Sequence, residues 1–411
     1  MTGTPPPYVP EPGPDALARR LRSLLVANVP VACGVYCGLA QPGPLSARHA
    51  EATFARARHF AAGTVDELPH FNTNPPPILR VLAAASLGRA DAMGRRMADM
   101  PSDLASDLWR RVEERLRSPH ALTVDERSHA SDLMLRLGYV DGAAGLLGIE
   151  NADAAQHGFG AHAALAEFAV FTRGRSDRAV LESRALDLAR DRTRPARVRT
   201  VMATYVVVRN GKRGADTPAL HEAARLALAA MAESDADDFA ASLSRQTVHR
   251  AVAFLPFVRH DLAGTLAHLD RALAYQDAAK AHAKSDLQRL AWIDHAFPLH
   301  ETIARTHLRL GDVGAAIAAT DELVALSPND SRCWDLRGQA LVRAGRYDEA
   351  LVAWGRAIPL GGLPVAKAAY HLGWIHEQLG DPDRAREHYR LSWRIDPTVP
   401  VVAARIDRDA A

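Results

Sequence analysis

The sequence predicts an all-α protein built as a right-handed superhelical solenoid of stacked helical hairpins. Within residues 297–399, Gly311, Gly345 and Gly380 lie 34 and then 35 residues apart, and an alanine follows each glycine at the same distance. A period of about 34 residues, in which a glycine separates two apolar runs, is typical of helical hairpins that stack on one another. Elsewhere the apolar residues keep near-helical spacing and no alternating strand pattern persists.

Each hairpin needs small residues where its two helices cross, because a larger side chain would push the helices apart. These residues are Ala304, Gly338 and Gly373 on the first helices, and Ala316, Ala350 and Ala385 on the second helices. Large side chains such as Trp334, Trp354 and Tyr389 fill the space around the crossing at helical spacing.

The ends of the helices are marked as well. Gly311, Gly345 and Gly380 each follow the last apolar residue of a first helix, so we expect them to end it in a left-handed conformation. Pro328 and Pro397 are expected to stop second helices. One hairpin cannot bury its apolar face alone, so stability is expected to come from stacked neighbours.

These units resemble tetratricopeptide repeats, and the resemblance covers about a quarter of the chain, with some departures. His300 stands where that family favours Trp, Thr320 where it favours a bulky aromatic, and Arg337 where it favours Leu. One extra residue lies between the second and third repeats, near residues 361–364.

The predicted organisation has five parts. They are a flexible Pro-rich leader at residues 1–14, an N-terminal helical domain at 15–150, a divergent repeat-like helical region at 151–296, three repeats at 297–399, and a capping helix with a tail at 400–411. The apolar stretch at 24–40 is interrupted by Asn28 and Pro30, which favours a buried helix over a signal peptide or a membrane span. Residues 205–208, Tyr-Val-Val-Val, fit a helix or a strand.

Composition favours no special class of partner. The formal net charge is +2, so the overall balance does not indicate a nucleic acid or a membrane. The only cysteines are Cys33, Cys37 and Cys333, which fits a reducing cytoplasm. The bias towards Arg, Ala, Gly and Pro suggests GC-rich coding and an actinobacterial source.

No residue can be given a catalytic or metal-binding role, and no cofactor is indicated. His268 and Asp270 match the start of an iron-binding motif but fall inside a predicted helix, where a structural role is favoured. His300 and His307 occupy packing positions of the repeat, which favours packing over a metal site. The spacing of Cys33 and Cys37 lacks the third ligand of an iron–sulfur motif.

In stacks of tetratricopeptide repeats the first helices line a concave face. The resemblance places on that face Glu301, Arg305, Arg309, Arg332, Asp335, Gln339, Arg343, Lys367, Tyr370, Trp374, Glu377 and Gln378. Cations outnumber anions in this set, Arg binds carboxylates through two hydrogen bonds, and the two aromatic residues offer flat anchors. The expected guest is an extended or helical peptide with acidic groups or a free carboxylate.

One subgroup of the family binds chaperone C-termini through a clamp of Lys, Asn and Arg side chains. The clamp positions fall here on Glu301, Arg305, Leu336, Lys367 and His371. Only Lys367 matches, so a chaperone tail is not expected.

The sequence therefore favours a scaffold that binds a peptide or protein partner in its groove, and one setting is the presentation of a peptide to a tailoring enzyme. Two alternatives stay open. One is an enzyme of unfamiliar type with a site around His157, His162, or His70 and the proline loop at 75–77. The other is a regulatory sensor in which the helical array controls an attached effector.

Overall fold

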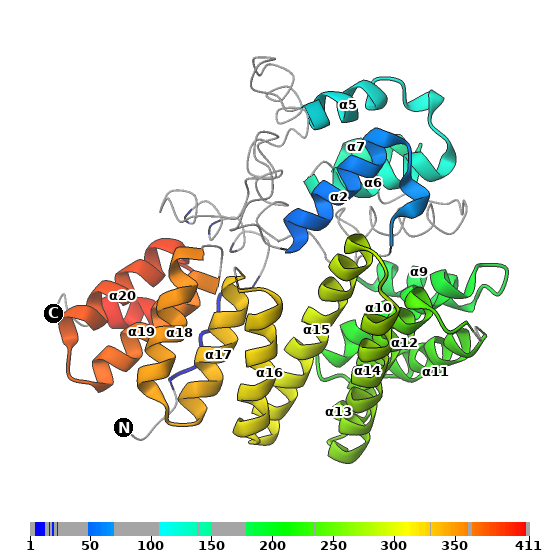
Figure 1. The fold of residues 1–411 in the computed structure, drawn as a ribbon. Coiled ribbons are helices and arrows are strands. Elements are labelled where there is room, and N and C mark those ends of the chain that lie inside the picture. The colour runs from blue at the N-terminus through cyan, green and yellow to red at the C-terminus, as the bar shows by residue number, and fades with distance from the viewer. Residues whose placement is uncertain are drawn as a thin grey trace. The chain divides into compact units, whose positions relative to one another are not determined.

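The computed structural model describes residues 5–12, 16, 19, 23, 48–69, 107–137, 140–148, 178–233, 236–328, 330–360 and 364–407. All regular structure within these ranges is helical, which confirms the prediction of an all-α fold (Figure 1). The chain forms two compact units, one of residues 1–50, 76–95 and 300–411, the other of residues 51–75 and 96–299. Predictions on Cys33, Cys37, His70, His157, His162 and residues 24–40, 75–77 and 361–363 fall outside the described ranges.

The unit that holds the repeats consists of helices in antiparallel succession. They are the last part of α15 (Asp286–Leu310), then α16 (Val313–Leu326), α17 (Ser331–Arg343), α18 (Tyr347–Ala357) with the short η4 (Ile358–Leu360), α19 (Pro364–Gln378), α20 (Pro382–Ile395) and α21 (Pro400–Asp407). Helices α17 and α18 form one hairpin and α19 and α20 form the next, and α18 packs on α19. The second helices α16 and α20 end just before Pro328 and Pro397.

The turns inside the hairpins repeat the same geometry. Gly311, Gly345 and Gly380 have φ of +80°, +73° and +76°, the left-handed region that favours glycine. The residue after each glycine donates its N–H to a carbonyl five residues earlier, as Arg346 does to Leu341 at 2.9 Å. This is the Schellman ending of a helix, and it satisfies carbonyls that the helix leaves unpaired.

The small residues lie at the helix crossings as expected. A Cβ on Gly338 would lie 2.6 Å from Nε1 of Trp354, and a Cβ on Gly373 would lie 2.8 Å from Cδ1 of Tyr389. Trp354 is fully buried in a cluster that joins the second and third repeats. The glycines therefore let large rings of the second helices contact the backbone of the first helices.

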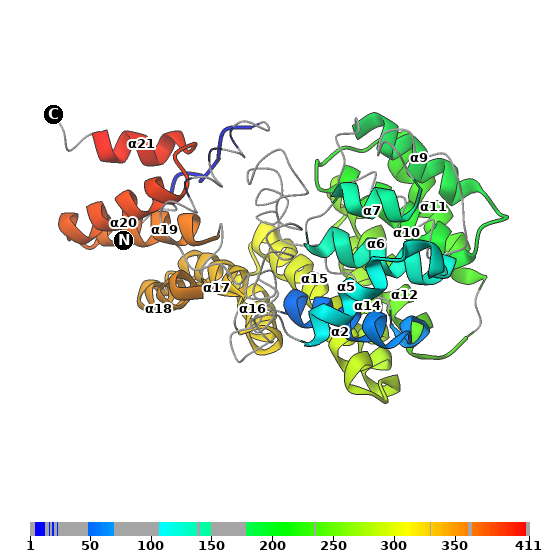
Figure 2. The ribbon, with the colours of Figure 1, turned by 90° about the horizontal axis from the view of Figure 1, so that it is seen from above.

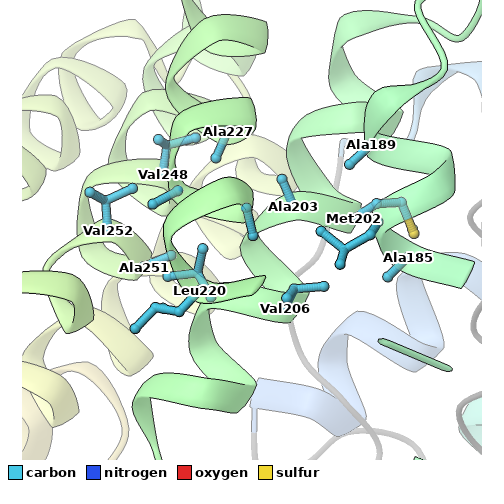
Figure 3. Packing of buried hydrophobic residues seen from close by; sticks show 14 of the residues in the cluster. Ala185, Ala189, Met202, Ala203, Val206, Leu220, Ala227, Val248, Ala251 and Val252 are labelled. Carbon is cyan, nitrogen blue, oxygen red and sulfur yellow. The ribbon is translucent and has the colours of Figure 1, made fainter. Parts of the chain in front are cut away.

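The other unit contains helices that precede the repeats. They are α2 (Arg48–Ala62), α5 (Asp107–Leu116), α6 (Val124–Leu137), α7 (Val140–Leu146), α9 (Arg178–Arg190), α10 (Ala196–Gly211), α11 (Pro218–Ala232), α12 (Phe239–Val252), α13 (Phe254–Val258), α14 (Leu262–His282) and the first part of α15, with the short η2 (Val65–Glu67) and η3 (Pro119–Ala121). Helix α10 lies at the centre of one core, where Met202, Val206 and Val248 pack together (Figure 3).

Residues 205–208, which fit a helix or a strand by sequence, belong to helix α10. Val206 and Val207 are both fully buried, because α10 packs against α9, α11 and α12. A helix that is covered on several sides loses the polar stripe by which an amphipathic helix is recognised.

No helix among the described residues is both long and apolar enough to cross a membrane.

Candidate protein-interaction surface

The residues predicted to line the inner face come from α15, α17 and α19, and they differ in exposure. The exposed ones are Arg305, Arg309, Arg332, Arg343, Glu377 and Gln378; the partly buried ones are Glu301, Gln339 and Lys367; the buried ones are Asp335, Tyr370 and Trp374. The predicted set is therefore part surface and part core.

Four exposed arginines, Arg305, Arg309, Arg332 and Arg343, are called the arginine set below. Arg305 pairs with Glu301 one helical turn earlier, with 2.9 Å between Nη2 and Oε1. Arg332 pairs with Asp330 at the start of α17, with 2.6 Å between Nη2 and Oδ2, and its side chain stays 45% exposed. The Arg305 pair is exposed and therefore weak, so its guanidinium group can exchange Glu301 for a ligand carboxylate at little cost. The Arg332 pair is held more firmly, because Asp330 is buried.

Asp335 is a buried carboxylate rather than an anion of the surface. Its oxygens accept hydrogen bonds from Nε1 of Trp354 at 3.1 Å and Nε2 of Gln339 at 2.8 Å, and Nζ of Lys367 lies 3.8 Å away. Burial raises the pKa of Asp335, and Lys367 opposes part of the rise. The carboxylate thus connects the second repeat to the first helix of the third.

Trp374 does not offer an open aromatic surface, contrary to the expectation. Its side chain is only 4% exposed and belongs to the cluster between the second and third repeats. The ring of Tyr347 lies 6.2 Å from it, centroid to centroid. The ring is buried in the packing between neighbouring repeats, so it cannot contact a bound peptide.

Tyr370 is fully buried, and part of its cover comes from outside the three repeats. Its hydroxyl donates to the carbonyl oxygen of Pro6 at 2.9 Å, and the guanidinium of Arg405 on α21 lies 5.8 Å from its ring. Burial raises the pKa of Tyr370, and a hydrogen bond from Arg405 opposes part of the rise. The hydroxyl therefore stays protonated at neutral pH and acts as a donor.

The structure describes residues 5–12 of the leader, which are called the leader segment below. This segment has no helix, strand or turn and forms hydrogen bonds with the third repeat. The prolines fix its backbone angles, so little conformational entropy is left to lose on docking.

Glu377 is exposed, but its carboxylate already accepts two hydrogen bonds. Its Oε2 accepts from the hydroxyl of Tyr389 at 2.6 Å and from Nε of Arg405 at 3.1 Å. This carboxylate fixes α21 on the third repeat, and a guest would have to compete with both donors.

His371, at a clamp position, is buried and stacks on Trp354 with 4.7 Å between ring centroids. Burial, with Lys367 nearby, lowers the pKa of His371 to about 3. The side chain is a neutral core residue at physiological pH.

Two histidines that were weighed as metal ligands, His268 and His307, have partners within the fold. His268 lies inside α14, where its Nδ1 is 3.1 Å from Nδ1 of His249, and burial lowers the pKa of both rings. His307 lies 3.5 Å from Asp312 at the end of α15. Across the described ranges, no three metal-ligating side chains come together in a cluster.

Sequence reasoning missed Pro6, Tyr8 and Arg405, which contact Tyr370, and it missed Asp396 and Thr398 as partners of the leader segment. One signal was available, since Tyr8 is the only aromatic residue among the prolines of the leader. Its partner could not be read from the sequence, because the contacts join residues more than 350 positions apart.

Family models described as tetratricopeptide repeat match residues 302–363 and 366–399. The C-terminal part of the chain therefore consists of tetratricopeptide repeats, as predicted, and no family model matches the N-terminal part. Among curated proteins, none matches the chain.

Similar solved structures include a crystal structure of MamA, 21% identical, which covers 38% of this chain and 80% of its own, with a TM-score of 0.30. A second is MamA from residue 41 to its end, from Desulfovibrio magneticus RS-1, 17% identical, with coverages of 48% and 95% and a TM-score of 0.35.

Proposed function

We propose that the tetratricopeptide repeats at residues 302–399 form a scaffold that binds a peptide or protein partner carrying acidic groups or a free carboxylate. The observation that supports the proposal is the difference between cations and anions on the first helices. The arginine set is exposed, whereas Asp335 is buried and Glu377 is engaged with Tyr389 and Arg405.

The chemistry of recognition follows from the guanidinium group. Its planar fork donates two parallel hydrogen bonds to one carboxylate, which gives geometric selectivity as well as attraction. The helices that carry the arginines are already fixed by their hairpins, so most of the ordering cost falls on the peptide. The attraction acts near the surface and should weaken as salt is added.

Two finer parts of the proposal concern the setting. Cys333 is buried, and its thiol donates to the carbonyl oxygen of Ser327 at 3.3 Å, which fits a reducing cytoplasm. Presentation of the bound peptide to a tailoring enzyme is the use that we propose for such a scaffold, and recruitment of the enzyme by the complex with the peptide would test it.

The test selects ligands from a library of random peptides with free C-termini, using the full chain. We expect enrichment of acidic peptides. A selected peptide should bind Arg309→Glu/Arg343→Glu about tenfold or more weakly than the wild type, since each tenfold corresponds to about 1.4 kcal/mol. Binding is measured by fluorescence anisotropy at low and high NaCl.

The matched control is Arg390→Glu/Arg394→Glu, which makes the same change of charge at exposed positions of the second helix α20. It should bind the peptides nearly as the wild type does. Equal losses in both variants would show that net charge alone matters. Selection of peptides without acidic residues would contradict the proposal.

A further inference from the structure

The leader segment, residues 5–12, lies along the third repeat and α21 (Figure 2). Two backbone contacts fix it. The carbonyl of Pro6 accepts from the hydroxyl of Tyr370 at 2.9 Å, and the N–H of Glu11 donates to the carbonyl of Thr398 at 2.9 Å. The segment is thus held near both of its ends.

Between these contacts, Tyr8 is the side chain that enters the repeat. Its ring lies 5.6 Å from the ring of Tyr370 and packs with Val399 and Val402. Its hydroxyl donates to Oδ2 of Asp396 at 3.0 Å. The next residue, Val9, points away and is 61% exposed.

The surroundings of Asp396 orient its carboxylate to accept a hydrogen bond from that hydroxyl. The residue is fully buried, and its other oxygen, Oδ1, accepts from the N–H of Thr398 at 3.1 Å and from the Thr398 hydroxyl at 2.6 Å. The carboxylate is therefore fixed by the turn, with Oδ2 directed at Tyr8. A buried acceptor that loses its donor costs about 1–3 kcal/mol, so this position selects a hydroxyl over an apolar group.

Helix α21 also contributes to the site that Tyr8 occupies. Arg405 lies over the rings of Tyr370 and Tyr389, 5.8 Å and 5.2 Å from their centroids, and is held by Glu377. Together, Tyr370, Asp396, Thr398 and Arg405 form a site with one side-chain donor, the Tyr370 hydroxyl, one backbone acceptor, the Thr398 carbonyl, and the buried carboxylate of Asp396. We call it the leader site.

The leader segment suits this site by its composition. Five of its eight residues are proline, so only Tyr8, Val9 and Glu11 have a backbone N–H that needs a partner. An extended proline-rich chain keeps its carbonyls available and loses little entropy on binding.

We propose that the leader site is a recognition site for extended, proline-rich segments bearing one tyrosine, and that the chain's own leader segment occupies it as a built-in competitor. A partner with such a segment binds by displacing residues 5–12. The leader site shares no residue with the arginine set, so it holds or fails independently of the proposed function.

The test uses a fluorescein-labelled synthetic peptide of residues 2–14 and the full chain in three forms. Tyr8→Ala should empty the site and bind the peptide. The wild type should bind it at least about tenfold more weakly, because a tethered segment competes at an effective concentration of about millimolar. Val9→Ala, changed at the exposed neighbour, should behave as the wild type does.

Two further variants test the chemistry of the site. A peptide with Phe in place of Tyr8 should bind the Tyr8→Ala chain about tenfold more weakly, because Asp396 loses its donor. Tyr370→Phe in the Tyr8→Ala background keeps the ring but removes the donor to Pro6, and should weaken the wild-type peptide several-fold. Equal binding of the Tyr and Phe peptides would overturn the proposal.

Hydrogen exchange of the chain gives a readout that needs no peptide. The amides of α21 should exchange faster in Tyr8→Ala than in the wild type and in Val9→Ala, since the leader segment covers Val402 and Thr398. Unchanged exchange would show that the segment does not occupy the site. A wild-type dimer that Tyr8→Ala dissociates would assign the site to the leader of a second copy and overturn the built-in competitor.

Discussion

Gly338 and Gly355 differ in what an added methyl group would meet. A Cβ on Gly338 would lie 2.6 Å from Nε1 of the fully buried Trp354, while a Cβ on Gly355 would meet nothing within 4 Å. We expect Gly338→Ala to destabilise the protein by about 2 kcal/mol, because the ring is held on all sides and has no room to shift. Urea denaturation followed by circular dichroism measures the change.

Gly355→Ala is the matched control, since Gly355 also lies inside a helix, α18. Here alanine only removes backbone freedom from the unfolded chain, and we expect a gain of about 0.5–1 kcal/mol. Equal effects at the two positions would mean that the crossing of α17 and α18 tolerates a larger residue.

His371 makes the stability of the repeats depend on pH. Burial lowers its pKa from 6.5 to about 3 in the folded chain, so the unfolded chain binds the proton more readily. Its contribution is therefore fully present above about pH 6.5 and is lost progressively as the pH falls below that value. Through this one group, lowering the pH from 7.5 to 5 should reduce the free energy of unfolding by about 2 kcal/mol.

His371→Phe keeps an aromatic ring against Trp354 and removes the titrating group. The free energy of unfolding, measured by urea at both pH values, should fall by about 2 kcal/mol less in this variant than in the wild type. Equal losses of unfolding free energy in both proteins would mean that the pKa of His371 is not lowered in the folded chain.

At the scale of elements, the turns inside the hairpins were predictable because each obeys a local rule. Gly345 has φ of +73°, and the N–H of Arg346 closes the Schellman ending by donating to Leu341. A residue with a Cβ is strained in this conformation by about 1–2 kcal/mol.

We expect Gly345→Ala to destabilise the protein by about 1 kcal/mol and Gly345→Asn by less, because Asn tolerates the left-handed region. A Cβ at this position meets no neighbour within 4 Å, so backbone strain is isolated from crowding. The two variants are compared by thermal unfolding. A larger loss for Asn than for Ala would contradict the argument.

The inner face was less predictable than the turns. The repeat register places Tyr370 and Trp374 on the first helix of the third repeat, but it does not say what covers them. Trp374 is covered by the preceding helix, α18, through Tyr347, whereas Tyr370 contacts Pro6 and Arg405. The register predicts Asp335 as a surface anion, because a carboxylate that is buried by contacts with another helix looks the same in sequence as an exposed one.

At the scale of the whole molecule, the sequence predicted the class of fold and the repeats, where short-range patterns suffice. The sequence predicted less of the structure of the N-terminal part, because α10 is surrounded by other helices and shows no polar stripe. The docked leader segment could not be predicted, since its prolines indicate an extended chain and say nothing of a distant partner.

The contacts of Tyr8 and Pro6 can form only late in the synthesis of the chain. They join residues 388 and 364 positions apart, so the ribosome has made residues 5–12 long before it makes α19, Asp396 and α21. Contacts of such separation form late in folding. The N-terminal segment is consequently open to proteases and other proteins throughout synthesis, and it becomes covered only after the third repeat has emerged and folded. Loss of α21 by proteolysis would remove Val402 from the packing around Tyr8, so cleavage near residue 400 would loosen the contacts of residues 5–12.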